Sequence, residues 1–323
     1  MEYKTVGRTG VKVSSLCFGT MSFGGIADKE TSISMFNRCR EAGINFFDTA
    51  DVYNDGRAEE ILGECIDGCR DEIVLTSKVY APTSNDINSR GLSRRHIIEA
   101  VEDSLRRLNT SYLDFYFCHQ FDSQTAIEET LQAMDDLVRE GKILYPAASN
   151  WAAWQIEKAL GISARKEWAR FECIQPMYNL VKRQAEVEIL PMAQKENLGV
   201  ITYSPLGGGL LTGKYNKENQ PKNGRLVESD MYIQRYGEDV YYEISEKFAE
   251  HARRRGLEPA TLAVAWVKSH SVVTSPIIGA RNVEQLEDSL SSLEVNMTPE
   301  WRQEISELSM TPPPPTDRLE EIK

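Results

Sequence analysis

The sequence contains no C-x-x-C pair among its six cysteines, and it has only four histidines. Closely spaced cysteines and histidines mark most zinc sites and thiol redox centres, so the sequence predicts no metal site. Disulfide-stapled secreted domains are short and rich in cysteine, which this chain of 323 residues is not. We therefore expect a reduced, cytoplasmic protein.

Positive charge is also scarce, because 37 Lys and Arg residues face 49 Asp and Glu residues and the net charge is −12. A protein that binds nucleic acid over a broad surface usually carries a net positive charge. No nucleic-acid partner is therefore expected. A local basic pocket is still compatible with this balance. The first 15 residues lack the apolar segment of a signal peptide, and no apolar run approaches the length of a membrane span. We expect neither a leader nor a membrane partner.

Two familiar nucleotide-binding motifs are missing. No G-x-G-x-x-G occurs, so a Rossmann domain lacks its phosphate loop. A near-match to the P-loop starts at Gly208 and reads G-x-x-x-x-G-K, but Tyr215 follows Lys214 where a P-loop requires serine or threonine for Mg²⁺. An ATPase is therefore disfavoured.

Short apolar runs alternate with segments of helical periodicity along most of the chain. Most of the runs are apolar at consecutive positions, which is typical of parallel strands covered on both faces. The eight runs are residues 17–21, 46–50, 73–79, 113–119, 143–149, 173–178, 199–206 and 274–280. Helical patterns follow, for example in 57–69 and 93–108, and in 125–141 with a capping box of Thr125 and Glu128. Eight strand–helix units predict an α/β fold, the (β/α)8 TIM barrel.

No linker rich in proline or glycine divides the chain, so we expect one domain over residues 1–323. Residues 5–16 read as an N-terminal β-hairpin able to plug the bottom of the barrel. Residues 207–237 read as a long loop after strand 7, and loops of that length are usually functional. The tail, 310–323, is expected to be extended and exposed.

Polar residues gather where the predicted strands end, which is where barrel enzymes place their active sites. Asp48 ends the second strand and Tyr53 follows in its loop; Lys78 ends the third strand and His119 the fourth. Taken one at a time, each has an ordinary structural explanation, such as a turn aspartate or a core histidine. Their coincidence at one rim is what indicates a site.

This set of side chains suits reduction of a carbonyl group, in which hydride reaches carbon and a proton reaches oxygen. Tyrosine has a pKa of about 10 and is a poor acid near neutrality. A neighbouring ammonium, Lys78, lowers that pKa, and Asp48 keeps the lysine charged and oriented. His119 then orients the carbonyl oxygen or shares the proton. On this interpretation Tyr53 is the general acid, and Asp51 only shapes the turn.

Several segments resemble the aldo-keto reductase family: "FFDTADVYNDGRAEEILGE", "VLTSKV", "QPMYNLVKR", "YSPLGGGLLTGKY" and "SPIIGARNVEQLEDSL". They extend over nearly the whole chain in the family's order. The resemblance implies a (β/α)8 barrel, a nicotinamide nucleotide cofactor and a catalytic tetrad of Asp48, Tyr53, Lys78 and His119. Ala58 stands where a serine is common, and Ser289 where an asparagine often contacts adenine.

The same resemblance implies that Ser149, Asn150 and Gln175 hold the nicotinamide carboxamide and that Tyr203 stacks on its ring. Further cofactor contacts are expected from Gly19, Thr20, Met21, Ser204, Pro205, Leu206, Gly209, Lys214, Ile278, Gly279, Arg281, Gln285 and Ser289. Arg281 begins a predicted helix whose free N–H groups favour an anion, and arginine suits a 2′-phosphate. NADPH is therefore expected rather than NADH.

The predicted function is NADPH-dependent reduction of an aldehyde or ketone to an alcohol. The alternative is a nucleotide-binding regulatory subunit with little turnover, since channel subunits of the family keep the cofactor and the fold. Residues expected around the substrate are Met21, Phe23, Tyr80, Trp151 and Tyr178, which favour apolar or ring-containing carbonyl compounds. The sequence indicates no particular oligomeric state.

Overall fold

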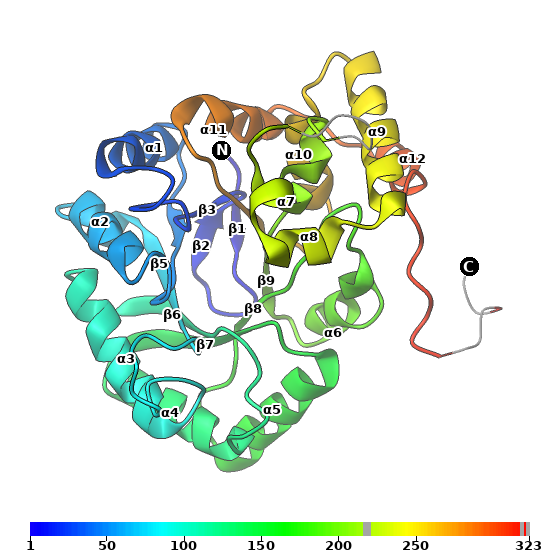
Figure 1. Ribbon diagram of the computed structural model, residues 1–323. Coiled ribbons are helices and arrows are strands. Elements are labelled where there is room, and N and C mark those ends of the chain that lie inside the picture. The colour runs from blue at the N-terminus through cyan, green and yellow to red at the C-terminus, as the bar shows by residue number, and fades with distance from the viewer. Residues whose placement is uncertain (216–220, 317–319, 321–323) are drawn as a thin grey trace.

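Eight parallel strands close into a barrel in the computed structural model, which describes residues 1–215, 221–316 and 320. The order around the barrel is β10-β3-β4-β5-β6-β7-β8-β9. The strands are β3 (Cys17–Gly19), β4 (Phe46–Asp48), β5 (Val74–Val79), β6 (Leu113–Cys118), β7 (Ile143–Ser149), β8 (Cys173–Gln175), β9 (Gly199–Thr202) and β10 (Ser275–Ile278). The predicted (β/α)8 barrel is confirmed (Figure 1).

Most of the predicted strands extend too far toward their C-terminal ends. The run 199–206 stops being a strand at Thr202, and the run 173–178 stops at Gln175. The residues beyond these points leave the sheet as loops, and Ser204 takes a left-handed conformation with φ 58°. These loops form the rim of the barrel, where the polar side chains gather.

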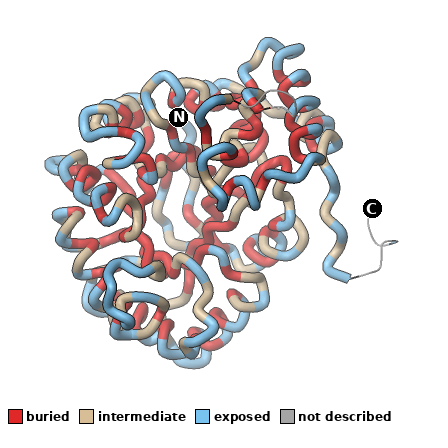
Figure 2. Tube along the Cα trace, in the orientation of Figure 1, coloured by how far each residue is buried: buried red, intermediate tan, exposed pale blue. Residues whose placement is uncertain are grey.

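Helices surround the barrel, and most of them bury one face and expose the other (Figure 2). They are α1 (Lys29–Glu41), α2 (Arg57–Ile66), α3 (Arg94–Arg107), α4 (Ile127–Arg139), α5 (Ala153–Lys166), α6 (Ile189–Lys195), α9 (Asp239–Arg254), α10 (Pro259–Lys268), α11 (Val283–Leu290) and α12 (Pro299–Ser306). The predicted capping box is wrong. Ala126 is the N-cap of α4, and the Thr125 hydroxyl donates to Asp122 instead, at 2.7 Å.

The N-terminal hairpin consists of β1 (Tyr3–Thr5) and β2 (Lys12–Ser14), which pair in antiparallel fashion. Val6 and Val13 are fully buried and pack against the inner cluster of the barrel with Phe46 and Phe115. A Cβ atom on Gly199 would lie 2.2 Å from Val6 Cγ1. The first residue of β9 therefore leaves room for the hairpin only if it is glycine. The hairpin therefore closes the end of the barrel remote from the polar rim.

The stretch 207–237 was expected to be a loop, but its described residues include the 3-10 helix η3 (Gly207–Thr212) and the short helices α7 (Arg225–Glu228) and α8 (Asp230–Tyr236). Residues 216–220 lie outside the described part of the chain. Tyr232 and Tyr236 are buried, which anchors α8 on the barrel. The segment is therefore a helical cover beside the barrel mouth (Figure 1).

In the described part of the expected tail, residues 310–316 form neither helix nor strand, and most of them are exposed. Among the described helices, none is both long and apolar enough to cross a bilayer.

Candidate active site

Asp48 and Lys78 form a buried ion pair at the rim. They end the neighbouring strands β4 and β5, which places them side by side. The Lys78 Nζ lies 2.6 Å from Asp48 Oδ2 and 2.7 Å from the Thr49 carbonyl oxygen. The side chain of Lys78 is 0% exposed and that of Asp48 is 3% exposed. A buried charge is tolerated only when it is paired and hydrogen-bonded, as both of these are.

The second carboxylate oxygen of Asp48 is also occupied. It accepts hydrogen bonds from the Thr76 hydroxyl at 2.7 Å and from Gln175 Nε2 at 2.9 Å. The carboxylate is thus held by groups from β5 and β8, on different sides of the barrel. Its position, and with it that of the Lys78 ammonium, is fixed by the barrel strands.

Tyr53 lies in the turn between β4 and α2. Its hydroxyl is 3.4 Å from Lys78 Nζ, and the ammonium lies 5.0 Å from the centre of its ring. The turn that carries it is left-handed at Asn54, Asp55 and Gly56, with φ of 50°, 57° and 86°. Asparagine, aspartate and glycine adopt this conformation most readily. The sequence "YNDG" therefore builds the turn that aims the phenol at the lysine.

Opposing effects set the pKa values of Tyr53 and Lys78. Burial raises the pKa of Tyr53, the Lys78 charge lowers it, and the balance lies above the usual tyrosine value. Burial alone would lower the pKa of Lys78, but the charge of Asp48 and the contact with Tyr53 raise it above its usual value. Lys78 thus lowers the pKa of Tyr53, as predicted, although burial has the larger effect. The lysine offsets only part of the desolvation of the phenolate.

His119 follows β6 and its ring lies nearly perpendicular to that of Tyr53, with centroids 6.1 Å apart. Burial and the positive charge of Lys78 lower the pKa of His119 to about 3. The imidazole is thus neutral at physiological pH. It can donate one hydrogen bond and accept another, but it does not act as a cation.

A chain of hydrogen bonds connects the rim residues of β7, β8 and β9. The Ser149 hydroxyl donates to the Gln175 carbonyl oxygen at 2.9 Å, and Asn150 Nδ2 donates to Ser149 Oγ at 3.0 Å and to the His119 carbonyl oxygen at 2.9 Å. The Tyr203 hydroxyl donates to Asn150 Oδ1 at 2.7 Å. The groups predicted to hold one end of the cofactor are therefore brought together.

A cavity of about 640 Å³ opens at this rim. Asp48, Tyr53 and His119 line it, and Lys78 lies fully buried behind them. Every residue predicted to contact the cofactor lines the same cavity except Thr20. Thr20 is fully buried and its hydroxyl donates to the Asp48 carbonyl oxygen at 3.2 Å, so its side chain supports the strand rather than the cavity.

The end of the cavity remote from the tetrad is positively charged. Lys214, Arg225 and Arg281 line it. Burial and then the charges of Arg281 and Arg225 lower the pKa of Lys214, which shows that the three cations repel one another. Glu228 approaches Arg281 at 4.0 Å and neutralises part of this charge. A local basic pocket thus exists in a protein whose net charge is −12.

Among the cavity residues that sequence reasoning missed are Arg225 of α7 and Tyr232 and Arg235 of α8. The spacing of arginine and tyrosine residues in 225–236 could have indicated a functional segment. It did not show which face of these helices lies against the cavity. Of the five residues predicted around the substrate, Met21 and Tyr80 line the cavity. Phe23 and Tyr178 are fully buried in the core, and Trp151 lines a neighbouring cavity instead.

Asp51 does not serve the turn as expected. Both of its carboxylate oxygens are buried and have no hydrogen-bond partner among the described residues. Nearby, Glu59 accepts from the Ser77 hydroxyl at 2.5 Å and from Arg107 Nε at 2.7 Å. Burial, and then the charge of Glu59, raise the pKa of Asp51 to about 8. Asp51 is therefore a buried acid that is largely protonated at neutral pH.

Comparison with known proteins identifies the family of the chain. The chain folds into a closed eight-stranded parallel barrel with a buried Lys–Asp pair, a tyrosine and a histidine at one rim. The model of the aldo/keto reductase family matches residues 15–309. The chain belongs to this family, which includes oxidoreductases and generally binds nicotinamide cofactors.

Similar proteins carry different functional names. An uncharacterised oxidoreductase, YrpG, of Bacillus subtilis is 38% identical over 93% of each chain. A probable voltage-gated potassium channel subunit beta of Arabidopsis thaliana is 38% identical over 91% of this chain and 92% of its own. Versiconal hemiacetal acetate reductase of Aspergillus parasiticus is 30% identical over 95% and 96%. Both enzymes and channel subunits are thus among the relatives.

Proposed function

We propose that this protein reduces an aldehyde or ketone to an alcohol with NADPH, in the cytoplasm. The observation that carries the proposal is the placement of Tyr53 at the wall of the cavity, 3.4 Å from a lysine that Asp48 holds in place. The cavity has room for an extended dinucleotide, and its two ends differ in chemistry. One end carries the tetrad and amide groups, and the other carries cations.

The residues at the cationic end fit the phosphates of the cofactor. Lys214, Arg225 and Arg281 line this part of the cavity, and Glu228 offers Arg281 a partial counter-charge at 4.0 Å, so an anion would relieve the repulsion that Lys214 experiences. Asn282 caps α11, and the N-terminal N–H groups of a helix favour negative charge. Arginine at this position supports a preference for the additional 2′-phosphate of NADPH over NADH.

At the other end, Asn150, Ser149 and Gln175 supply amide and hydroxyl groups for the carboxamide of the cofactor, and Tyr203 supplies a ring for stacking. When bound, the reduced nicotinamide supplies the hydride that goes to the carbonyl carbon. Everything else in the reaction falls to residues of this chain.

Tyr53 donates its proton to the carbonyl oxygen as the hydride arrives, and the product is an alcohol. The raised pKa of Tyr53 keeps the phenol protonated beforehand, which is the form that reduction requires. The Lys78 ammonium then stabilises the phenolate, and solvent returns the proton. The neutral imidazole of His119 donates a hydrogen bond that orients the carbonyl oxygen.

The direct test is oxidation of NADPH followed across a panel of aldehydes and ketones. Met21 and Tyr80 at the mouth favour apolar or ring-containing substrates. Turnover by the wild type that Tyr53→Phe abolishes supports the proposal. A wild type that binds NADPH but turns over no carbonyl compound contradicts it.

The alternative is a regulatory subunit that binds the nucleotide and turns it over slowly or not at all. What favours it is the similarity to proteins named as channel subunits, at 38% identity for the Arabidopsis protein and 35% for one from Oryza sativa. Both functions need the same cavity and cofactor. They differ in turnover, which the same assay measures.

A further inference from the structure

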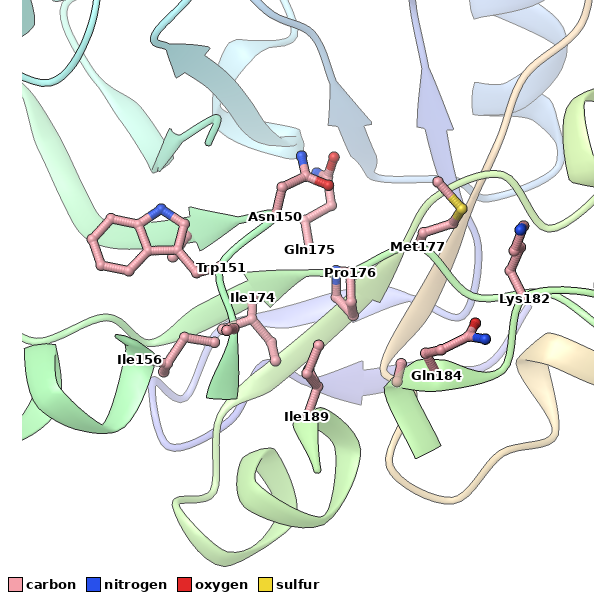
Figure 3. A pocket seen from close by; sticks show the side chains of 13 residues that line it. Asn150, Trp151, Ile156, Ile174, Gln175, Pro176, Met177, Lys182, Gln184 and Ile189 are labelled. Carbon is pink, nitrogen blue, oxygen red and sulfur yellow. The ribbon is translucent and has the colours of Figure 1, made fainter. Parts of the chain in front are cut away.

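A second cavity, of about 420 Å³, lies beside the first on the outer side of the barrel rim. It is enclosed by the start of α5, the residues after β8, and the segment that joins η2 (Gln184–Glu186) to α6. Figure 3 shows Trp151 at one side of it and Lys182 with Gln184 at the other. Small-molecule sites commonly occupy about 300–1,000 Å³, so this cavity is large enough to hold one.

Most of its wall is apolar. Trp151, Ile156, Ile174, Met177 and Ile189 face it, and no acidic residue lines it. An apolar wall of this kind accommodates a hydrocarbon or aromatic body, because burying that surface removes it from water.

The cavity wall carries three amide side chains, of Asn150, Gln175 and Gln184, and two groups that only donate, the Trp151 indole and the Lys182 ammonium. The Trp151 indole N–H is buried, and no acceptor for it exists among the described residues. Lys182 is half-buried and forms no ion pair within the described part of the chain. Its ammonium donates to the Tyr241 hydroxyl at 2.8 Å and lies 4.3 Å from the centre of that ring. A cation without a carboxylate partner favours an acceptor with negative charge, and Lys182 supplies that cation here.

We propose that this cavity is a second binding site, for a small amphipathic anion with an aromatic or aliphatic body and a carboxylate or sulfonate group. The body lies against Trp151, Ile174 and Ile189, and the acidic group meets Lys182 at the rim. The site is distinct from the cofactor cavity, although Asn150 and Gln175 contribute to the walls of both.

The probe is 2-naphthoate, titrated into the full-length protein by fluorescence and compared with its uncharged amide, 2-naphthamide. The cofactor cavity is also basic, so the titrations are run with saturating NADP⁺. Ile189→Trp fills the second cavity without touching the first, and Lys182→Met removes its cation. Lys195→Met, at an exposed lysine of the same helix as Ile189, is the control.

We expect the wild type to bind naphthoate and Ile189→Trp to weaken that binding by roughly tenfold or more. Lys182→Met weakens naphthoate by roughly tenfold and leaves the amide nearly unchanged, because a hydrogen bond to a charged group is lost only with the acid. Lys195→Met changes neither. If Ile189→Trp does not melt like the wild type, Ala152→Leu at the cavity wall replaces it.

If a folded Ile189→Trp or Ala152→Leu protein binds naphthoate as tightly as the wild type does, the proposed binding site is wrong. An amide that binds as tightly as the acid, or a Lys182→Met protein that binds both normally, overturns the assignment to anions. Failure of the proposed cofactor function is distinguishable, because NADP⁺ would then have no effect on any titration while the comparison between variants would stand.

Discussion

The Gln175 side chain donates a hydrogen bond to Asp48 Oδ1 at 2.9 Å. Asp48 in turn holds Lys78 through its other oxygen, at 2.6 Å. A residue expected to contact the carboxamide of the cofactor is thus bonded to the carboxylate that fixes the catalytic lysine. Under the proposed mechanism, cofactor binding and proton transfer therefore share one hydrogen-bonded unit.

Gln175→Leu is therefore expected to impair two properties at once. NADPH affinity falls because an amide contact is lost, and the rate of the chemical step falls because Asp48 loses one of its donors. Thr76→Val removes the other donor to the same oxygen, at a residue that does not line the cavity, so it should slow the chemical step and leave NADPH affinity unchanged. Fluorescence titration and single-turnover kinetics measure the two effects. Gln175→Leu acting on affinity alone would contradict the shared unit.

Arg225 and Arg281 are expected to carry the preference for NADPH. Alanine at either position should weaken NADPH by roughly 10–100-fold, the usual loss for a charge-assisted contact, and should barely affect NADH. Arg254→Ala, on the exposed side of α9, is the control and should change neither affinity. Equal affinities of the wild type for both nucleotides would rule out this role.

Asp51 is expected to make stability depend on pH. Its pKa is about 8 in the folded protein, whereas an unfolded aspartate has a pKa of about 3.9. The native state therefore keeps a proton that the unfolded state releases, and stability falls as pH rises from about 4 to about 8, by up to about 1.4 kcal/mol per pH unit.

Asp51→Asn cannot ionise, so its melting temperature relative to the wild type should rise between about pH 5 and about pH 8. Exposed Asp67→Asn is the matched control and should show no such trend. A stability difference that is the same at both pH values would show that Asp51 is not a protonated buried acid.

His119 should stay neutral through the physiological range because its pKa is about 3. Its imidazole resonances, assigned by comparison with His119→Gln, should not shift between about pH 5 and about pH 8, where an ordinary histidine titrates. A midpoint near 6.5, the usual histidine value, would contradict the assignment of a neutral imidazole throughout this range.

The number and order of the strands could be predicted because both faces of each are buried, which leaves consecutive apolar runs. The proximity of Asp48, Tyr53, Lys78 and His119 could be predicted because the strand ends of a barrel meet at one rim. The strand limits could not, because residues after Gln175 and Thr202 are as apolar as the strands themselves.

The surroundings of Tyr178, Arg225 and Asp51 could not be predicted, because residues distant in the sequence create them. Tyr178 looks like a rim residue by position, but Arg302 of α12 donates to its hydroxyl at 2.7 Å and α12 helps to bury it. Arg225 lies in a stretch whose helices form only against the barrel. Asp51 precedes Tyr53 by two residues, yet its surroundings, including Arg107 of α3, come from elsewhere in the chain. Local sequence does not contain this information.

Lys78→Met should slow carbonyl reduction, because the phenolate of Tyr53 loses the charge that stabilises it. Asp48→Asn should cost less, since Asp48 acts through the lysine. The double variant of Tyr53→Phe and Lys78→Met should be much less impaired than the product of the single effects, because both residues serve one proton transfer. Multiplicative effects in steady-state kinetics would show that the two residues act independently.

The most direct measurement is carbonyl reduction by Tyr53→Phe with NADPH and with its 4-deuterated form. The substitution removes one hydroxyl and leaves the ring, so NADPH affinity should be unchanged. The rate should fall by about 10²–10⁴-fold, the range for loss of a general acid. The deuteride isotope effect should be present, which shows that chemistry limits the rate. A Tyr53→Phe enzyme that keeps the full rate while showing that isotope effect would contradict the mechanism.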